Sequence, residues 1–195
     1  VTEVRYCATG SAIETEFNVV SVDTGGSAPQ PRARVGTVTS SCGICGRDAI
    51  DELTSRLTPL AGTDLLDPAL AVLIGDRVAR QQELFERTGG VHAAAAFDLV
   101  SGEPTVVRED IGRHNAVDKV VGRLLLDGRL PNADHPAGLW VSGRASFEMV
   151  QKAWAGGFGA LLSVSAPSAL AVETATSANL TLLGFVRNGG AVIYT

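Results

Sequence analysis

The feature that most constrains the fold is a regular alternation of strand-like and helix-like segments over residues 91–195. The clearest helix begins after Asn115, where apolar side chains recur at positions 117, 120, 121, 124 and 125. Apolar runs typical of strands occupy residues 91–99, 105–108, 139–141, 160–165, 181–186 and 191–194. This order predicts a three-layer α/β sandwich, in which helices pack on a mixed, mostly parallel sheet.

Composition limits the class of protein. A chain of 195 residues has room for one well-buried domain, or for one domain and a small appendage. Its hydrophobic content of 45% with only 5% aromatic residues indicates an aliphatic core. The net charge of −5 argues against non-specific nucleic-acid binding but permits a local basic pocket. No apolar run approaches the length of a membrane span.

The first 90 residues are less regular. Residues 1–22 predict two short strands, residues 23–31 have the composition of a loop, and residues 47–57 have helical spacing. Asp67 and Pro68 predict the start of a helix that continues to Gly89. We therefore expect an N-terminal β segment and flexible loop at 1–40, a cysteine loop and helices at 41–90, and the α/β body at 91–195. Because the chain begins inside a predicted strand without an initiator Met, we expect its N-terminal region to be truncated.

Two cysteines are the clearest candidates for chemistry. Cys42 and Cys45 lie three positions apart, each followed by a glycine, just before the helical pattern at 47–57. Backbone N–H groups near a helix N-terminus favour thiolate over thiol. The pattern is compatible with a sulfur-carrying nucleophile, with half of a zinc site, or with two small structural residues. The odd count of three cysteines and the lack of a signal peptide favour a reducing cytoplasm.

Polar clusters follow three of the expected strands, at residues 108–115, 142–146 and 165–168. In an α/β sheet, ligands collect where the strands end and the helices begin. Backbone N–H groups there can bind phosphate, and Arg113 and Arg144 would add positive charge. The three clusters together predict a site for an anionic, nucleotide-like ligand, although each could also be ordinary loop and cap structure.

Four segments together, residues 41–46, 85–92, 108–119 and 142–144, closely resemble the FdhD family of formate dehydrogenase accessory sulfurtransferases. The resemblance runs from about residue 5 to residue 195. It implies a body similar in fold to cytidine deaminases and a homodimer. It also implies a protein that takes persulfide sulfur from a cysteine desulfurase and transfers it to bis-molybdopterin guanine dinucleotide, so that formate dehydrogenase can mature.

The same resemblance implies roles for particular residues. Cys42 is similar to the persulfide-bearing cysteine of the family, and Cys45 to its partner in the loop. The guanine dinucleotide is expected near the last hairpin, at Phe185, Val186, Arg187, Asn188, Gly189 and Gly190. We expect further contacts to the cofactor, or to GDP as its mimic, from Arg113, His114, Asn115, Ser142 and Arg144. His114 could equally hold its own loop.

Four alternatives compete with this interpretation. A zinc deaminase needs a Glu two positions after its metal ligand, and here His92 is followed by two alanines. A structural zinc site would need two further ligands, and the remaining Cys and His residues lack paired spacing, so no metal is expected. A thioredoxin-like reductase would carry its cysteines directly after a strand. The strongest rival is a non-catalytic chaperone that binds the cofactor. His92, Cys7, Trp140 and Trp154 are expected to be structural.

Overall fold

A computed structural model describes residues 1–6, 12–28, 55, 57–61, 66–131 and 136–195. Contacts divide the chain into two units, Val1–Cys45 and Gly46–Thr195. The described helices before residue 91 and the sheet of residues 91–195 therefore belong to one unit.

The first unit contains a small antiparallel sheet. Strand β1 (Glu3–Tyr6) pairs with β2 (Val20–Asp23), and the rings of Tyr6 and Phe17 meet edge to face with centroids 5.3 Å apart. The two predicted strands are present. The second is short because residues 12–17 form turns, in which Glu16 and Phe17 adopt positive φ values of 50° and 59°.

A six-stranded sheet organises the second unit, in the order β4-β3-β5-β6-β7-β8. The neighbours β5, β6 and β7 are parallel, whereas β3 and β8 run against them; β4 is antiparallel to β3 and so shares the direction of β5. The predicted mixed sheet is therefore confirmed, with its parallel pairing confined to the centre. The strands are β3 (His92–Asp98), β4 (Pro104–Asp110), β5 (Ala137–Val141), β6 (Ala160–Ser163), β7 (Thr181–Arg187) and β8 (Gly190–Ile193).

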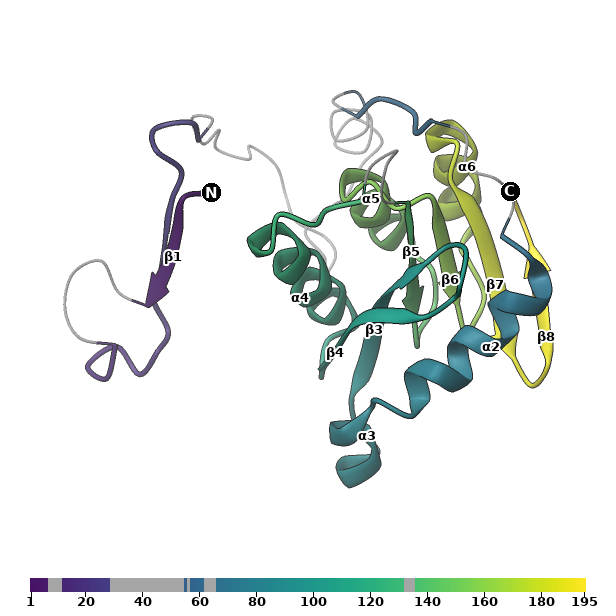
Figure 1. The fold of residues 1–195 in the computed structure, drawn as a ribbon, viewed down its shortest axis with the longest axis horizontal. Helices are drawn as coiled ribbons and strands as arrows, with labels where there is room; N and C mark the ends of the chain where they lie inside the picture. The colour runs from purple at the N-terminus through teal and green to yellow at the C-terminus, as the bar shows by residue number, and fades with distance from the viewer. Residues whose placement is uncertain (7–11, 29–54, 56, 62–65, 132–135) are drawn as a thin grey trace. The chain divides into compact units, whose positions relative to one another are not determined.

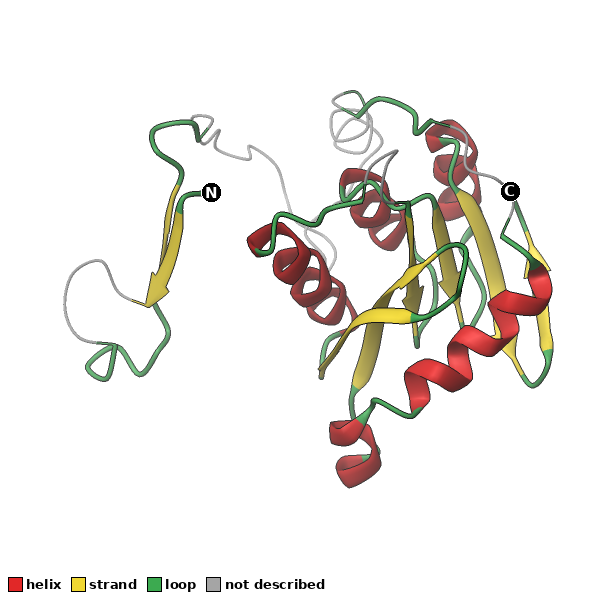
Figure 2. Cartoon of the chain, in the orientation of Figure 1, coloured by secondary structure: helices red, strands yellow, loops and turns green. Residues whose placement is uncertain are grey.

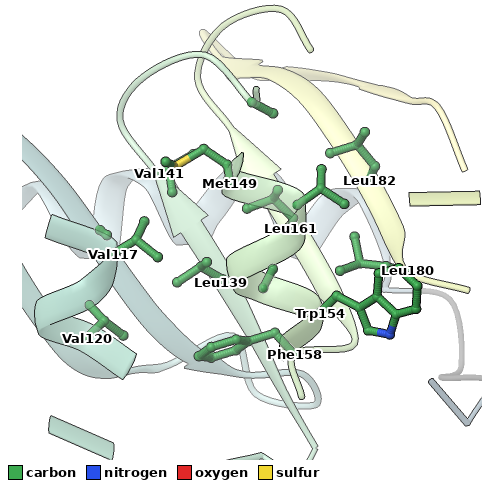
Figure 3. Packing of buried hydrophobic residues seen from close by; sticks show 14 of the residues in the cluster. Val117, Val120, Leu139, Val141, Met149, Trp154, Phe158, Leu161, Leu180 and Leu182 are labelled. Atoms are coloured by element: carbon green, nitrogen blue, oxygen red, sulfur yellow. The ribbon is translucent and has the colours of Figure 1, made fainter. Parts of the chain in front are cut away.

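Helices cover both faces of this sheet (Figure 1). On one face, α4 (Arg113–Leu126), α5 (Phe147–Ala155) and α6 (Ala169–Ala178) bury their apolar sides. Figure 3 shows this core, where Val117 from α4 and Met149 from α5 surround Leu139 and Leu161 of the sheet. On the other face lies α2 (Pro68–Ala79), with Ala71, Ile74 and Val78 buried. The predicted three-layer sandwich is confirmed.

Alternation along the strands explains why both faces are apolar. In β3, Ala94 and Ala96 belong to the core under α4, while Ala93, Ala95 and Phe97 belong to the core under α2. Successive side chains of a strand point to opposite faces, so a central strand covered on both sides is a continuous apolar run. The small alanines allow helices to approach this strand closely.

Local capping fixes several helix ends, of which the start of α2 was predicted. The Asp67 side chain accepts the N–H of Ala69 at 2.9 Å, and Pro68 occupies the first turn of α2. The Ser168 side chain accepts the N–H of Ala171 at 3.2 Å at the start of α6. At the other end of α6, Asn179 adopts the left-handed conformation that often ends a helix.

The predicted single helix from Pro68 to Gly89 is wrong. The helix α2 ends at Ala79, and a separate short helix, α3 (Glu83–Thr88), follows (Figure 2). The N–H groups of Leu84 and Phe85 donate to the Glu109 carboxylate rather than to the preceding turn, each at 2.8 Å. A side chain distant in sequence thus replaces the intrahelical hydrogen bonds, which local periodicity could not indicate.

Candidate functional site

A cavity of about 800 Å³ opens where the central strands end. Residues from α2, from the segment around α3, and from the ends of β5, β6 and β7 line it. Its polar side chains are Asp76, Gln82, His92, Ser142, Arg187 and Asn188. Its volume is in the range of small-molecule and cofactor sites, which are commonly 300–1,000 Å³.

Strand direction explains the position of the cavity. The strands β4, β5, β6 and β7 point the same way, so their carboxyl ends meet at one edge of the sheet. Ligands of α/β proteins bind outside that edge. Ile111, Ser142, Val164 and Val186 line the cavity from just beyond β4, β5 and β6 and from within β7.

An irregular hairpin forms one wall. The register of β7 against β8 shifts between Gly184 and Arg187, where Phe185 has a φ of 54°. This bulge leaves Phe185 partly exposed, while Val186 is buried and lines the cavity. The turn at Asn188 and Gly189 has φ values of 52° and 78°, the pair of positive angles that a tight hairpin turn favours.

Trp140 and Gly75 lie together on the α2 side. Trp140 is only 3% exposed and lines the cavity, and its buried indole Nε1 has no hydrogen-bond partner among the described residues. A Cβ on Gly75 would lie 3.6 Å from that nitrogen. A buried donor without a partner costs about 1–3 kcal/mol, so an acceptor reaching Nε1 would be stabilising. From the sequence, Trp140 was expected to be only structural.

His92 was also assigned a structural role, but it lines the cavity. Its Nδ1 lies 3.2 Å from the Ser142 hydroxyl, which accepts the N–H of Ala93 at 3.0 Å. Ser142 thus links the His92 ring to the backbone near the start of β3. Because β3 runs antiparallel to β5, its first residue lies at the edge where β5 ends. Only knowledge of this pairing would have identified His92 from the sequence.

The predicted cofactor-binding residues are brought together only in part. Ser142, Val186, Arg187, Asn188 and Gly189 line the cavity. Among the residues that the structure describes, six others of that set do not line it: Arg113, His114, Asn115, Arg144, Phe185 and Gly190.

Near the start of α4, Arg113 and His114 are half-buried. Within the described part of the chain, Arg113 Nε and His114 Nε2 are buried and have no hydrogen-bond partner. Burial lowers the pKa of His114 below its ordinary value of 6.5, and the positive charge of Arg113 lowers it further. His114 is therefore held toward its neutral form, in which it cannot add charge toward a phosphate.

The segment at 108–119 builds the turn from β4 into α4. Asp110 accepts the N–H of Gly112 at 2.9 Å and the side-chain amide of Asn115 at 3.1 Å. Lys119 donates to the carbonyl of Glu109 at 2.9 Å and lies 2.5 Å from the Asp110 carboxylate. The most distinctive motif of the sequence thus holds a strand–helix junction beside the cavity.

Asp110 makes the junction sensitive to acid. The Lys119 ammonium, followed by the N–H of Gly112, lowers the pKa of Asp110 from 3.8 to about 2. A lowered folded-state pKa stabilises the protein above pH 3.8, and this contribution is lost as the pH falls toward 2.

We expect Asp110→Asn to lower the free energy of unfolding by about 1 kcal/mol at neutral pH. The difference in unfolding free energy between the two proteins should vanish as the pH approaches the Asp110 pKa of about 2. Urea denaturation between that pH and neutral pH measures it. A difference that does not change with pH would contradict the role given to the Asp110 carboxylate.

The three cysteines, including the catalytic candidates Cys42 and Cys45, lie outside the described residues, as does His135. Within the described part of the chain, no group of three or more His, Cys, Asp or Glu side chains could hold a metal ion. No helix in that part is long and apolar enough to cross a bilayer.

Comparison with known proteins gives the family. The FdhD/NarQ family model matches residues 2–195. The chain belongs to the FdhD/NarQ family. The family predicted from the four sequence motifs is thereby confirmed, and the match extends over almost the whole chain.

Relatives within the FdhD/NarQ family share much of this sequence. The chain is 50% identical over 161 residues to the sulfur carrier protein FdhD of Anaeromyxobacter dehalogenans, a match of 80% of this chain and 56% of that protein. It is 46% identical over 199 residues to the sulfur carrier protein FdhD of Nocardia farcinica, with 100% of this chain and 70% of that protein covered. The chain thus spans little more than half the length of the first relative.

A solved structure of the same family has a similar fold. It is the crystal structure of a candidate formate dehydrogenase accessory protein from Desulfotalea psychrophila. The TM-score is 0.63 at 30% identity, and the match covers 74% of this chain and 59% of the other. An experimental structure of an FdhD/NarQ-related protein therefore supports the α/β architecture described above.

Proposed function

We propose that this protein is a sulfurtransferase of formate dehydrogenase maturation. It would accept persulfide sulfur from a cysteine desulfurase on Cys42 and deliver it to bis-molybdopterin guanine dinucleotide. The observation that carries the proposal is the cavity at the carboxyl edge of the sheet, lined by Ser142 and by residues 186–189 of the last hairpin. Family membership and the relatives named as sulfur carriers support the same role.

The sulfur-transfer chemistry would proceed in two steps. The Cys42 thiolate attacks the terminal sulfur of the donor persulfide, the donor S–S bond breaks, and the donor cysteine leaves as a thiolate. The Cys45 thiolate could then attack Cys42, forming a disulfide and releasing the terminal sulfur as sulfide. In that route the two cysteines supply the two electrons. In a relay, Cys45 would instead accept the persulfide sulfur itself.

Charge and hydrogen-bonding groups in the cavity suit a guanine nucleotide. Arg187 supplies a guanidinium that can pair with phosphate oxygens. Asp76 is the one carboxylate among the described lining residues, and a carboxylate accepts hydrogen bonds from the N1–H and amino group of guanine. The cavity therefore offers separate groups for the two ends of the nucleotide.

Binding of GDP tests this site. We expect Arg187→Ala to weaken GDP binding by about 10-fold, because a charge-assisted hydrogen bond to phosphate is lost. Arg129→Ala is the matched control, since Arg129 is exposed, does not line the cavity and was never assigned to the site. Isothermal calorimetry should show parental affinity for Arg129→Ala. Equal affinities for all three proteins would remove the cavity from the proposal.

A chaperone that only presents the cofactor is the second candidate. The same cavity would serve it, and the cysteines would have no part in sulfur transfer. The two functions differ in whether Cys42 is required for formate dehydrogenase activity.

A further inference from the structure

The short helix α3 forms part of the cavity wall without belonging to the core. None of its residues is buried, and Figure 2 shows it as a separate short helix beyond the end of α2. Yet Phe85 from α3, Gln82 before it, and Gly89 and Gly90 after it all line the cavity. A wall element without buried side chains needs some other attachment to keep its position.

Glu109 provides that attachment. Its two carboxylate oxygens each accept one backbone N–H, from Leu84 and from Phe85, both at 2.8 Å. The N-cap residue of α3, Gln82, makes no side-chain capping bond of its own. Glu109 thus caps the helix from β4, and its negative charge is favourable beside the first turn of a helix.

The carboxylate is itself firmly placed. Glu109 is paired with Ala93 in the β3–β4 ladder, and its carbonyl accepts the Lys119 ammonium at 2.9 Å. The far end of α3 is capped locally, because Gly89 has a φ of 63° and donates its N–H to the carbonyl of Phe85 at 2.7 Å. The helix is therefore fixed at its first turn by one side chain, while its last turn leads into two glycines.

We propose that Phe85 is a ligand-contact residue that packs against the planar ring of the bound nucleotide, and that Glu109 is the positioning residue that holds Phe85 there. This inference rests on the proposed function, because it assumes that a heterocyclic ring enters the cavity. Phe85 is 46% exposed although it borders the cavity, so a stacked ring would bury apolar surface that now faces solvent.

Substitutions on α3 test the contact. Stacking of an aromatic side chain on a base changes affinity by about 5-fold to about 100-fold, so Phe85→Ala should weaken GDP binding within that range while Phe85→Tyr retains it. Leu84→Ala is the matched control: its side chain is 40% exposed on the same helix and does not line the cavity. Parental affinity is expected for this control. If the parent protein binds GDP and Phe85→Ala binds it with the same affinity, the inference about Phe85 is overturned and the proposed function is not. If the parent protein binds no GDP, the proposed function is overturned as well.

A ligand-free measurement tests the attachment. In Glu109→Gln an amide nitrogen replaces one acceptor, so hydrogen exchange at the amides of Leu84 and Phe85 should accelerate by about 10-fold or more. Glu86→Gln removes the same charge from α3 itself and should leave these amides unchanged. The Glu109→Gln protein should also bind GDP more weakly than its parent. Unchanged exchange at both amides in Glu109→Gln would contradict the positioning role, whatever the nucleotide affinity.

Discussion

Replacing Cys42 with alanine is expected to reduce sulfur transfer to the background level of a strain without the protein. The proposed chemistry requires a thiolate that forms a persulfide, and no other group can take over that covalent step. The measurement is formate dehydrogenase activity in a strain that lacks the native protein and carries the Cys42→Ala variant. GDP affinity of the purified variant should equal that of the parent, because the residues proposed to hold the nucleotide are unchanged.

Two further cysteine variants make this result specific. Cys7→Ala should retain full activity, since Cys7 has no role in the proposed transfer. Cys45→Ala separates the two routes, because persulfide would accumulate on Cys42 if Cys45 is needed to release or relay the sulfur. Full complementation by Cys42→Ala would favour the chaperone, in which the cysteines carry no sulfur.

A second large effect is expected from Gly138→Ala in the middle of the sheet. A Cβ on Gly138 would lie 2.1 Å from Cζ of Phe97, and Phe97 is completely buried opposite it in the β3–β5 ladder. Because Phe97 is fully buried and protein interiors are close-packed, its ring can move only by displacing other core side chains, so we expect a loss of about 3 kcal/mol in the free energy of unfolding. Urea denaturation measures it. The strand β5 also carries Trp140, and Ser142 follows it, so the variant should bind GDP poorly.

A double-mutant cycle identifies the cause of that loss. Phe97→Leu leaves a cavity and should itself be destabilising. In combination with Gly138→Ala, however, the smaller leucine side chain removes the clash. The double variant should therefore be more stable than the sum of the two single effects predicts. Gly122→Ala in α4 is the control, because a Cβ there meets nothing within 4 Å. It should stabilise the protein by about 0.5–1 kcal/mol. Additive effects of Phe97→Leu and Gly138→Ala would show that the clash is not the cause.

The sequence was most informative where local chemistry decides the structure. The apolar stripe of α4 and the Asp67 cap of α2 both involve residues within a few positions of one another. The separate start of α3 could not be predicted, because the carboxylate that caps it comes from Glu109, about 25 residues away. The antiparallel pairing of β3 with β5 was likewise invisible to an analysis of single segments.

The candidate site shows the same division. Rules for α/β sheets and the family resemblance pointed to Ser142 and to the hairpin at 186–189, which share the cavity. Asp76, Phe85 and Trp140 were not predicted to bind a ligand, because they lie within a helix pattern or a strand pattern whose periodicity indicates packing alone. Their position at the cavity depends on how α2, α3 and β5 come together in the fold.

The most direct test of the central claim is to detect the sulfur on Cys42. The protein would be incubated with a cysteine desulfurase and L-cysteine, and the peptide containing Cys42 would be analysed by mass spectrometry before and after treatment with a thiol reductant. We predict the added mass of one sulfur atom on Cys42, removed by the reductant and absent from the Cys42→Ala protein. A chain that gains no sulfur, or gains the same amount after Cys42→Ala, would contradict the account.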